Sequence, residues 1–301
     1  MNMKRTSRPT TLEELDTLFA KVFSKECREH GLAFQPNPTD IIITPFAKCG
    51  TTWLQQIAHG LRTRGNMDFE EISNVTPWIE VALDLGIDLD ASQVAEPRVF
   101  KSHLSWRDVP KGGRYIVAFR APSDAFISLY RFFEDFFFEP GKIDLDTLFR
   151  WRNPPAEMGE RGYWHHLASW WEQRNNPDVL ILCYEDMRAD LPETVRRIAS
   201  FMDIALDDEL FARVVRQASR QFMLEHKDQF GEAPFRRLMS QRMGLPFDGN
   251  AYKVTSGVRE DPKYKLTAAH EQELDNIWQA QIASRFGLES YEDLRHEIRA
   301  Q

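Results

Sequence analysis

The chain has 301 residues, of which 42% are hydrophobic and 28% are charged. This is the composition of an ordinary globular protein, and it excludes collagen-like, disordered and coiled-coil classes. The 38 Lys and Arg residues against 46 Asp and Glu residues leave a net charge of -8. The protein therefore has no overall basic surface for a nucleic acid, and any polyanionic ligand needs a local cluster of cations.

The three cysteines, Cys27, Cys49 and Cys183, are far apart and form no CxxC pair. Their spacing argues against a disulfide framework and against a zinc site, and it fits the reducing cytoplasm. No apolar stretch follows the basic residues at the amino terminus, and no window approaches 18 uninterrupted apolar residues. We therefore expect a cytoplasmic protein that does not span a membrane.

The first part of the chain is expected to form a helical lead-in over residues 1–39. Thr11 and Glu14 have the spacing of a capping box, and apolar residues then recur at helical spacing as far as Gly31. This pattern predicts a single helix that packs by one face.

Four short apolar runs predict buried β-strands, at residues 40–44, 99–103, 115–119 and 179–184. Helical patterns separate several of them, and strands that alternate with helices indicate a parallel sheet with helices on both faces. The expected fold class is therefore α/β, a single domain over residues 1–301 with a central parallel β-sheet. Ligands of such folds bind at the carboxyl ends of the strands.

Residues 44–53 read TPFAKCGTTW and lie between the first predicted strand and an apolar helix. A Gly/Lys/Thr/Thr turn at a helix N-terminus offers backbone N–H groups, two hydroxyls and one ammonium to the same point. This predicts a phosphate-binding loop. The loop is not a Walker A sequence, because Lys48 precedes Gly50 instead of following it.

This segment resembles the 5′-phosphosulfate loop of cytosolic-type sulfotransferases, whose usual form is YPKSGTTW. Further motifs match in the same order: residues 101–104 (KSHL) resemble KTHLP, and residues 120–128 (RAPSDAFIS) resemble RNPKDxxxS. Residues 162–187 then carry the GxW, WW and YEDM landmarks of the family. Ordered motifs over this much of the chain are far more specific than one short loop, and they imply a P-loop-like fold.

The resemblance also implies the chemistry. The expected sulfuryl donor is 3′-phosphoadenosine 5′-phosphosulfate (PAPS), the product is 3′,5′-diphosphoadenosine (PAP), and the acceptor is a hydroxyl or amine of a small molecule. His103 is expected to be the base for the acceptor proton, Lys48 to stabilise the leaving oxygen, and Lys101 to assist at the sulfuryl group. No metal is expected, because lysines supply the positive charge.

The nucleotide-binding residues implied by the resemblance have distinct roles. The loop residues hold the 5′-phosphate, Arg120 and Ser128 bind the 3′-phosphate, and Trp53 stacks on adenine. Cys49 replaces the family's serine and is expected to be a small cradle residue, not a nucleophile, because transfer in this family is direct. The full expected set is Lys48, Cys49, Gly50, Thr51, Thr52, Trp53, Arg120, Ser128, Tyr184, Ser219, Arg220, Ser256, Gly257 and Arg259.

The chain departs from the family pattern near its carboxyl end. The family has RKGxxGDWK where residues 255–263 read TSGVREDPK, so the Arg-Lys pair for the 3′-phosphate is missing. We expect Arg259, and after it Lys253, to be the substitute cation. Arg220 stands where the family has an adenine-stacking Phe, and a guanidinium plane can also stack on a base.

Other features leave alternatives open. The family's dimer segment is altered at Ala268 and Gln272, so both a monomer and a homodimer are compatible with the sequence. The aromatic run at residues 132–138 forms either core or the apolar wall of an acceptor pocket, which favours a lipophilic or aromatic acceptor. His165 and His166 are adjacent and point to different helix faces, so a structural role is expected.

The departures also keep two other functions open. One is a non-catalytic nucleotide-binding regulator or scaffold on the same fold. The other is a P-loop kinase-like NTPase, which is disfavoured because no lysine follows Gly50 and no strand ends in a convincing magnesium-binding Asp. Five intact residues of the family motifs favour the sulfotransferase: Lys48, Lys101, His103, Arg120 and Ser128.

Overall fold

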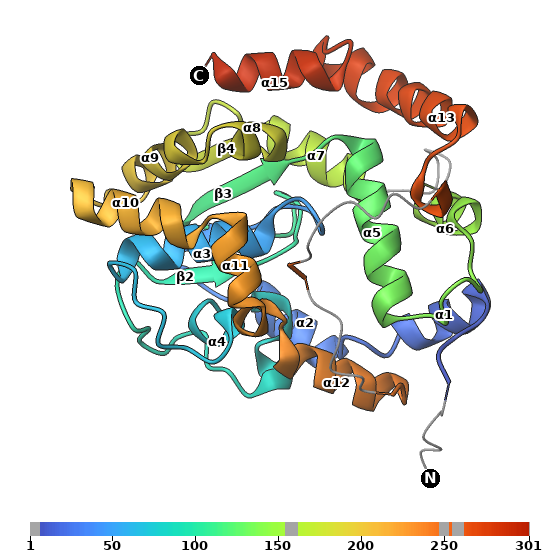
Figure 1. Ribbon diagram of the computed structural model, residues 1–301, viewed down its shortest axis with the longest axis horizontal. Helices are drawn as coiled ribbons and strands as arrows, with labels where there is room; N and C mark the ends of the chain where they lie inside the picture. The colour runs from blue at the N-terminus through green and yellow to red at the C-terminus, as the bar shows by residue number, and fades with distance from the viewer. Residues whose placement is uncertain (1–6, 154–161, 247–252, 255–261, 301) are drawn as a thin grey trace.

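A four-stranded parallel β-sheet forms the centre of the protein (Figure 1). The structure is a computed structural model, and it describes residues 7–153, 162–246, 253–254 and 262–300. The strands are β1 (Ile41–Ile43), β2 (Val99–Lys101), β3 (Arg114–Phe119) and β4 (Val179–Cys183), in the spatial order β2-β1-β3-β4. All neighbouring strands are parallel, which confirms the predicted α/β class and the four predicted strands.

Both faces of the sheet are covered by helices. Ile41 and Ile43 of β1 belong to an apolar cluster with α3 (Thr51–Arg62), α9 (Leu191–Phe201) and α10 (Asp208–Gln217). Ile42 points to the other face, where α5 (Pro122–Phe136) and α7 (Tyr163–Trp171) supply the packing. Burial on both faces explains why the strand sequences are almost continuously apolar instead of alternating.

The N-terminal segment forms two helices, so the prediction of one helix as far as Gly31 was wrong. They are α1 (Leu12–Phe19) and α2 (Lys25–Leu32). Ser24 begins α2, because its hydroxyl accepts a hydrogen bond of 3.1 Å from the Cys27 N–H. The break lets α2 lie against Ile79, whose carbonyl oxygen is 2.6 Å from the place that a Cβ on Gly31 would take. Helical spacing could not show this turn, because it depends on packing against a distant segment.

The remaining α-helices surround this core. They are α4 (Ile72–Val75), α6 (Leu145–Arg152), α8 (Tyr184–Ala189), α11 (Arg220–Glu225), α12 (Ala233–Met243), α13 (Ala268–Trp278), α14 (Ser284–Phe286) and α15 (Tyr291–Arg299). In Figure 1, α13 and α15 cross the side of the molecule near α7 and α8, and α12 lies at the opposite side. Across the described ranges, no helix is both long and apolar enough to cross a membrane.

The carboxyl ends of the strands bring the predicted site residues to one edge of the sheet. Residues 44–50 follow β1 and lead into α3, and His103 follows β2. Arg120 directly follows β3, and Tyr184 directly follows β4. Because parallel strands end at the same edge, these segments converge where α/β folds bind their ligands.

Candidate active site

Residues 44–50 form a tight loop between β1 and α3. Lys48 and Gly50 both have left-handed backbone, with φ of 71° and 97°, and Gly50 is the N-cap of α3. A Cβ on Gly50 would lie 3.1 Å from the Tyr184 ring, so glycine allows this close approach. The first N–H groups of α3 have no intrahelical partner. A helix N-terminus of this kind suits a phosphate group, as the sequence predicts.

Two polar atoms beside this loop are buried without a hydrogen-bond partner among the described residues, Thr51 Oγ1 and Arg120 Nε. Arg120 Nη1 donates a hydrogen bond of 2.9 Å to the Lys48 carbonyl oxygen, and the guanidinium lies 4.5 Å from the centre of the Tyr184 ring. Ser128, two turns along α5, is partly buried. Unpartnered buried donors destabilise a protein, so their presence beside this loop fits a site that receives an anion.

Trp53 contacts both Tyr184 and Ala218, the residue that ends α10 just before α11. The Trp53 Nε1 donates a hydrogen bond of 2.8 Å to the Ala218 carbonyl oxygen, and the Trp53 and Tyr184 ring centres are 5.8 Å apart. Ser219 is the N-cap of α11, and Arg220 is its first residue. The structure therefore brings together the residues that the sequence assigned to the nucleotide base and its surroundings.

His103 is held by backbone groups. Its Nδ1 lies 2.8 Å from the Pro45 carbonyl oxygen, and a carbonyl can only accept, so Nδ1 carries the proton and Nε2 is left as an acceptor. The backbone N–H of His103 donates a hydrogen bond of 2.7 Å to Glu80 Oε1. Trp78 packs edge-on to the imidazole, with ring centres 5.2 Å apart. Burial lowers the pKa of His103 to about 3, so the imidazole is neutral at physiological pH.

Lys101 is almost completely buried, with 1% of its surface exposed. Its Nζ forms an ion pair with Glu232, which also pairs with Lys253, and lies 3.7 Å from the centre of the Trp78 ring. Burial lowers the pKa of Lys101 to about 8, against the opposing effect of Glu232. Burial acts to raise the pKa of Glu232, but the two lysines outweigh it and lower this pKa below its usual range. Lys253 therefore shares Glu232 with Lys101, the residue that the sequence analysis expects to assist at the sulfuryl group.

Lys48 and Cys49 have strongly altered acidities. The Lys48 Nζ lies 4.6 Å from the centre of the Phe132 ring. Burial, together with the nearby charges of Lys253 and Arg120, lowers the pKa of Lys48 to about 7. Burial raises the pKa of the Cys49 thiol to about 12, which makes a thiolate nucleophile unavailable near neutral pH. An anion beside Lys48 favours the charged ammonium.

Three buried carboxylates in this region were not predicted, those of Glu71, Glu80 and Glu232. Glu71 Oε2 accepts a hydrogen bond of 3.1 Å from the Ala233 N–H, just after Glu232. None of them belongs to a recognisable motif. The sequence could have indicated a buried carboxylate only for Glu80, which stands within the apolar stretch of residues 78–82. The predicted residues Ser256, Gly257 and Arg259 lie outside the described residues.

The aromatic run at residues 132–138 has two sides. Phe133 and Phe137 are buried in the core. Phe132 and Phe136 are only partly buried, and their ring centres are 4.6 Å apart. The run therefore supplies core packing on one side of α5 and an apolar surface beside Lys48 on the other.

His166 is buried behind the loop, where its Nε2 lies 3.0 Å from the Thr44 carbonyl oxygen. This contact fits the structural role predicted for it. Within the part of the chain that the structure describes, no group of three or more His, Cys, Asp and Glu side chains is placed to hold a metal ion.

Comparison with known proteins agrees with this geometry. The family model of the sulfotransferase domain matches residues 38–287. The chain belongs to the sulfotransferase family. It is 25% identical to the amine sulfotransferase of Oryctolagus cuniculus over 272 residues, 88% of this chain and 87% of that protein. It is 27% identical to sulfotransferase 2A1 of Homo sapiens over 256 residues, 81% of this chain and 84% of that protein.

Solved structures share the fold of this sulfotransferase-family chain. Mouse sulfotransferase SULT7A1, complexed with PAP, superposes with a TM-score of 0.65 at 19% identity over 93% of this chain and 94% of that one. Retinol dehydratase, in complex with androsterone and the inactive cofactor PAP, gives a TM-score of 0.64 at 16% identity over 88% of this chain and 86% of that one. These likenesses confirm the single α/β domain with helices on both faces of a parallel sheet.

Proposed function

We propose that this protein is a PAPS-dependent sulfotransferase that acts on a hydroxyl or amine of a small lipophilic or aromatic acceptor. The observation that carries the proposal is the combination of a neutral His103, held through Nδ1 by a backbone carbonyl, with a helix-N-terminal loop that contains Lys48. Family membership supports sulfuryl transfer, and structural neighbours were solved with PAP. The first relative named above is an amine sulfotransferase, which fits an acceptor class that includes amines.

The residues present fit a nucleotide with two phosphate groups. Thr51 Oγ1 and Arg120 Nε are buried donors without partners in the described ranges, and charge-assisted hydrogen bonds to phosphate are the strong ones. We assign the 5′-phosphate to Lys48 and residues 49–52, and the 3′-phosphate to Arg120 and Ser128. The adenosine is assigned to Trp53, Tyr184, Ser219 and Arg220.

The residues around the loop have distinct tasks in the proposed reaction. When bound, PAPS supplies the sulfuryl group: the acceptor oxygen forms the new bond to sulfur as the bond from sulfur to the phosphate oxygen breaks. His103 Nε2 takes the proton that the acceptor gives up. Lys48 neutralises the negative charge on the departing oxygen, and Lys101 assists at the sulfuryl oxygens. Phe132 and Phe136 form an apolar wall for the acceptor beside Lys48.

Transfer of ³⁵S from labelled PAPS to a panel of phenols, alcohols and amines, without added divalent metal, tests the proposal. His103→Ala should lower turnover by ~10²-fold or more while PAP binding stays nearly unchanged. Lys48→Ala should lower kcat by ~10²- to 10³-fold, as expected for loss of a preorganised donor. His296→Ala, an exposed histidine on α15, is the matched control and should retain wild-type turnover.

The same experiment separates the other functions. Tight binding of PAP without transfer to any acceptor would favour a nucleotide-binding regulator or scaffold. Nucleotide hydrolysis that EDTA abolishes and magnesium restores would favour a kinase-like NTPase. Near-normal turnover in His103→Ala would remove His103 from the mechanism.

A further inference from the structure

Glu232 lies between Lys101 and Lys253. One of its carboxylate oxygens pairs with the Nζ of Lys101, and the other pairs with the Nζ of Lys253. Glu232 and Lys101 are both almost completely buried, with 3% and 1% of their side chains exposed. Charges so far from water are tolerated only when they meet in good geometry. The carboxylate and the Lys101 ammonium therefore hold each other in one place.

The backbone of Glu232 has an unusual conformation. Its φ of 53° and ψ of 44° are left-handed, which is unfavourable for a residue with a Cβ. Glu232 is the N-cap of α12, and the N–H of the next residue, Ala233, donates a hydrogen bond of 3.1 Å to Glu71 Oε2. Strained residues of this kind persist where the surrounding structure fixes them, and they gather at functional sites. Here Glu71 fixes the start of α12, and the two lysines fix the carboxylate of Glu232.

Glu232 is the main counter-charge of Lys101. Burial lowers the pKa of Lys101, and the positive charge of Lys253 adds to this effect. Glu232 and, more weakly, Glu80 act in the opposite direction, and the resulting pKa is about 8. The neighbouring His103 is neutral, because burial lowers its pKa to about 3. Without Glu232, burial and Lys253 would be almost unopposed, and Lys101 would lose its proton at a lower pH.

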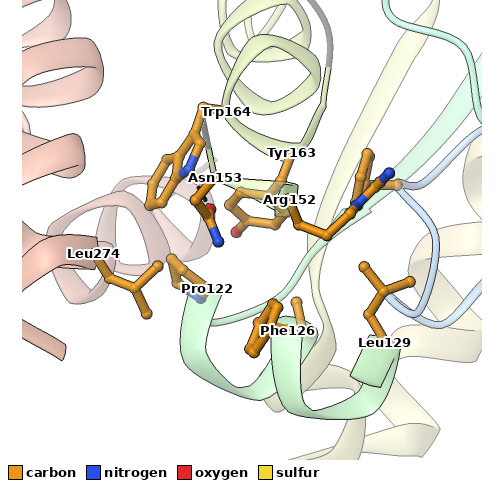
Figure 2. Close-up of a pocket in the computed structure, with 10 residues that line it drawn as sticks. Pro122, Phe126, Leu129, Arg152, Asn153, Tyr163, Trp164 and Leu274 are labelled. Atoms are coloured by element: carbon orange, nitrogen blue, oxygen red, sulfur yellow. Dashed lines mark hydrogen bonds between the residues drawn. The ribbon is translucent and has the colours of Figure 1, made fainter. Parts of the chain in front are cut away.

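The hollow between α5, the end of α6, the start of α7 and α13 offers no counter-charge for a lysine (Figure 2). Among its described lining residues, Arg152 is the one charged side chain, and it is a cation. Asn153 and Tyr163 are neutral and already hydrogen-bonded. This part of the molecule therefore cannot replace the carboxylate of Glu232.

We infer that Glu232 is a positioning residue of the proposed active site: its carboxylate fixes the Lys101 ammonium and keeps it charged for the sulfuryl oxygens. This inference rests on the proposed sulfotransferase function, which gives Lys101 that task. Glu232 acts through Lys101 and is not itself assigned to a substrate. It belongs to none of the motifs that the chain shares with the family. Lys253 competes for the same carboxylate, so its presence weakens the hold on Lys101.

The charge of Lys101 can be measured without turnover. In protein labelled with [ε-¹³C]lysine, the resonance that disappears in Lys101→Met belongs to Lys101, and its titration gives the pKa. Glu232→Gln should move this titration to lower pH by about one pH unit or more, because an opposite charge is lost. Lys253→Met should move it to higher pH, because a like charge is lost while Glu232 stays. A merely structural role of Glu232 would not produce changes of opposite sign.

The pH dependence of kcat gives a second readout. Lys101 must be charged for its proposed task, so Glu232→Gln should move the falling alkaline limb of kcat to lower pH. Its loss of kcat relative to wild type should be about tenfold at pH 8.5 and smaller at pH 6.5, and Glu232→Asp should keep part of the wild-type profile. Lys48 is influenced by the same two charges, Glu232 and Lys253. The ¹³C titration therefore distinguishes Lys101 from Lys48.

Glu134→Gln is the matched control. Glu134 is as buried as Glu232 and also has a lysine partner, Lys263, at 3.3 Å. Its removal breaks a buried contact of the same type elsewhere, so the Lys101 titration should stay as in wild type. Melting temperatures show whether each variant is folded.

An unchanged Lys101 titration in folded Glu232→Gln would overturn the inference, as would changes of the same sign in Glu232→Gln and Lys253→Met. If Glu232→Gln does not fold, the direction of the change in Lys253→Met decides: a move to higher pH supports the shared carboxylate, and no move contradicts it. If no acceptor receives ³⁵S from wild type, the proposed function fails, whereas the titration still decides whether Glu232 sets the charge of Lys101.

Discussion

Gly50 and Gly86 have similar left-handed backbone, with φ of 97° and 69°, but different surroundings. A Cβ on Gly50 would lie 3.1 Å from the Tyr184 ring, whereas a Cβ on Gly86 would meet nothing within 4 Å. Gly50→Ala and Gly86→Ala should each lower the free energy of unfolding by roughly 1–2 kcal/mol, the usual backbone strain of a non-glycine residue there. Chemical denaturation measures this loss.

Gly50→Ala should also weaken PAP binding, because the new methyl group pushes Tyr184 away from the loop. Gly86→Ala is the matched control and should bind PAP like wild type, since it bears similar backbone strain but its new methyl group would touch nothing within 4 Å. Equal PAP affinity in the two variants would show that the contact between Gly50 and Tyr184 does not shape the nucleotide site.

If Lys48 binds a phosphate of PAP as proposed, PAP binding should depend on pH. The pKa of Lys48 is lowered to about 7, first by burial and then by Lys253 and Arg120, against the opposing charges of Glu232 and Asp135. Below pH 7 the ammonium is already charged, whereas above it a bound phosphate must recruit a proton. PAP affinity should therefore fall between pH 7.5 and 9, by up to about tenfold per unit.

Calorimetry across this pH range in wild type and Lys48→Arg checks the prediction. Arginine stays charged throughout, so the variant should show a much flatter profile. The phosphates of PAP are almost fully ionised above pH 7.5, so they do not produce the same slope. A profile as steep in Lys48→Arg as in wild type would assign the titration to another group.

At the scale of elements, local patterns were predictable and long-range contacts were not. The strands and the loop of residues 44–50 depend on short apolar runs and on a helix N-terminus, and both are visible in a few residues. The partner of Lys101 was not predictable, because Glu232 lies 131 residues further along the chain. The same reason applies to Glu80, which is recognisable as a partner of His103 only after the fold brings the two together.

The strands β1 and β2 are joined at their amino ends by a buried ion pair. Arg98 Nε and Nη2 donate hydrogen bonds of 2.9 and 2.6 Å to the two carboxylate oxygens of Asp40, and both side chains are buried. Arg98→Met should lower the free energy of unfolding by about 3–5 kcal/mol, because it leaves the Asp40 charge buried without a partner. Urea denaturation measures the change.

Arg114 provides the comparison, since it pairs with Asp203 at the surface. Arg114→Met should cost at most about 1 kcal/mol. The double variant Asp40→Leu/Arg98→Met should be less destabilised than Arg98→Met, because no charge is left unpaired. A similar loss in Arg98→Met and Arg114→Met would mean that the buried pair contributes no more than an exposed one.

For the whole molecule, the site is assembled from segments that follow different strands. A net charge of -8 gives no general attraction for a polyanion, so the proposed recognition of PAP depends on the cations gathered at this edge of the sheet. Arg120 is central to this arrangement, because it contacts the Lys48 carbonyl oxygen and the Tyr184 ring at once. A nucleotide bound here would link the ends of β1, β3 and β4.

PAP should therefore stabilise the whole fold, and more strongly than AMP. A ligand at 100 times its Kd adds about 2.7 kcal/mol to the free energy of unfolding. One or two charge-assisted hydrogen bonds to the 3′-phosphate, at roughly 1.5–3 kcal/mol each, predict a preference for PAP over AMP on the order of 10- to 100-fold or more.

Thermal unfolding with each nucleotide, at equal concentration, measures this preference. In each variant, the increase in melting temperature is measured from that of the same variant without nucleotide. The difference between the increases given by PAP and AMP should almost vanish in Arg120→Ala and should partly remain in Arg120→Lys. Equal stabilisation of the wild-type protein by PAP and AMP would show that the 3′-phosphate is not recognised, and the assignment of Arg120 would be wrong.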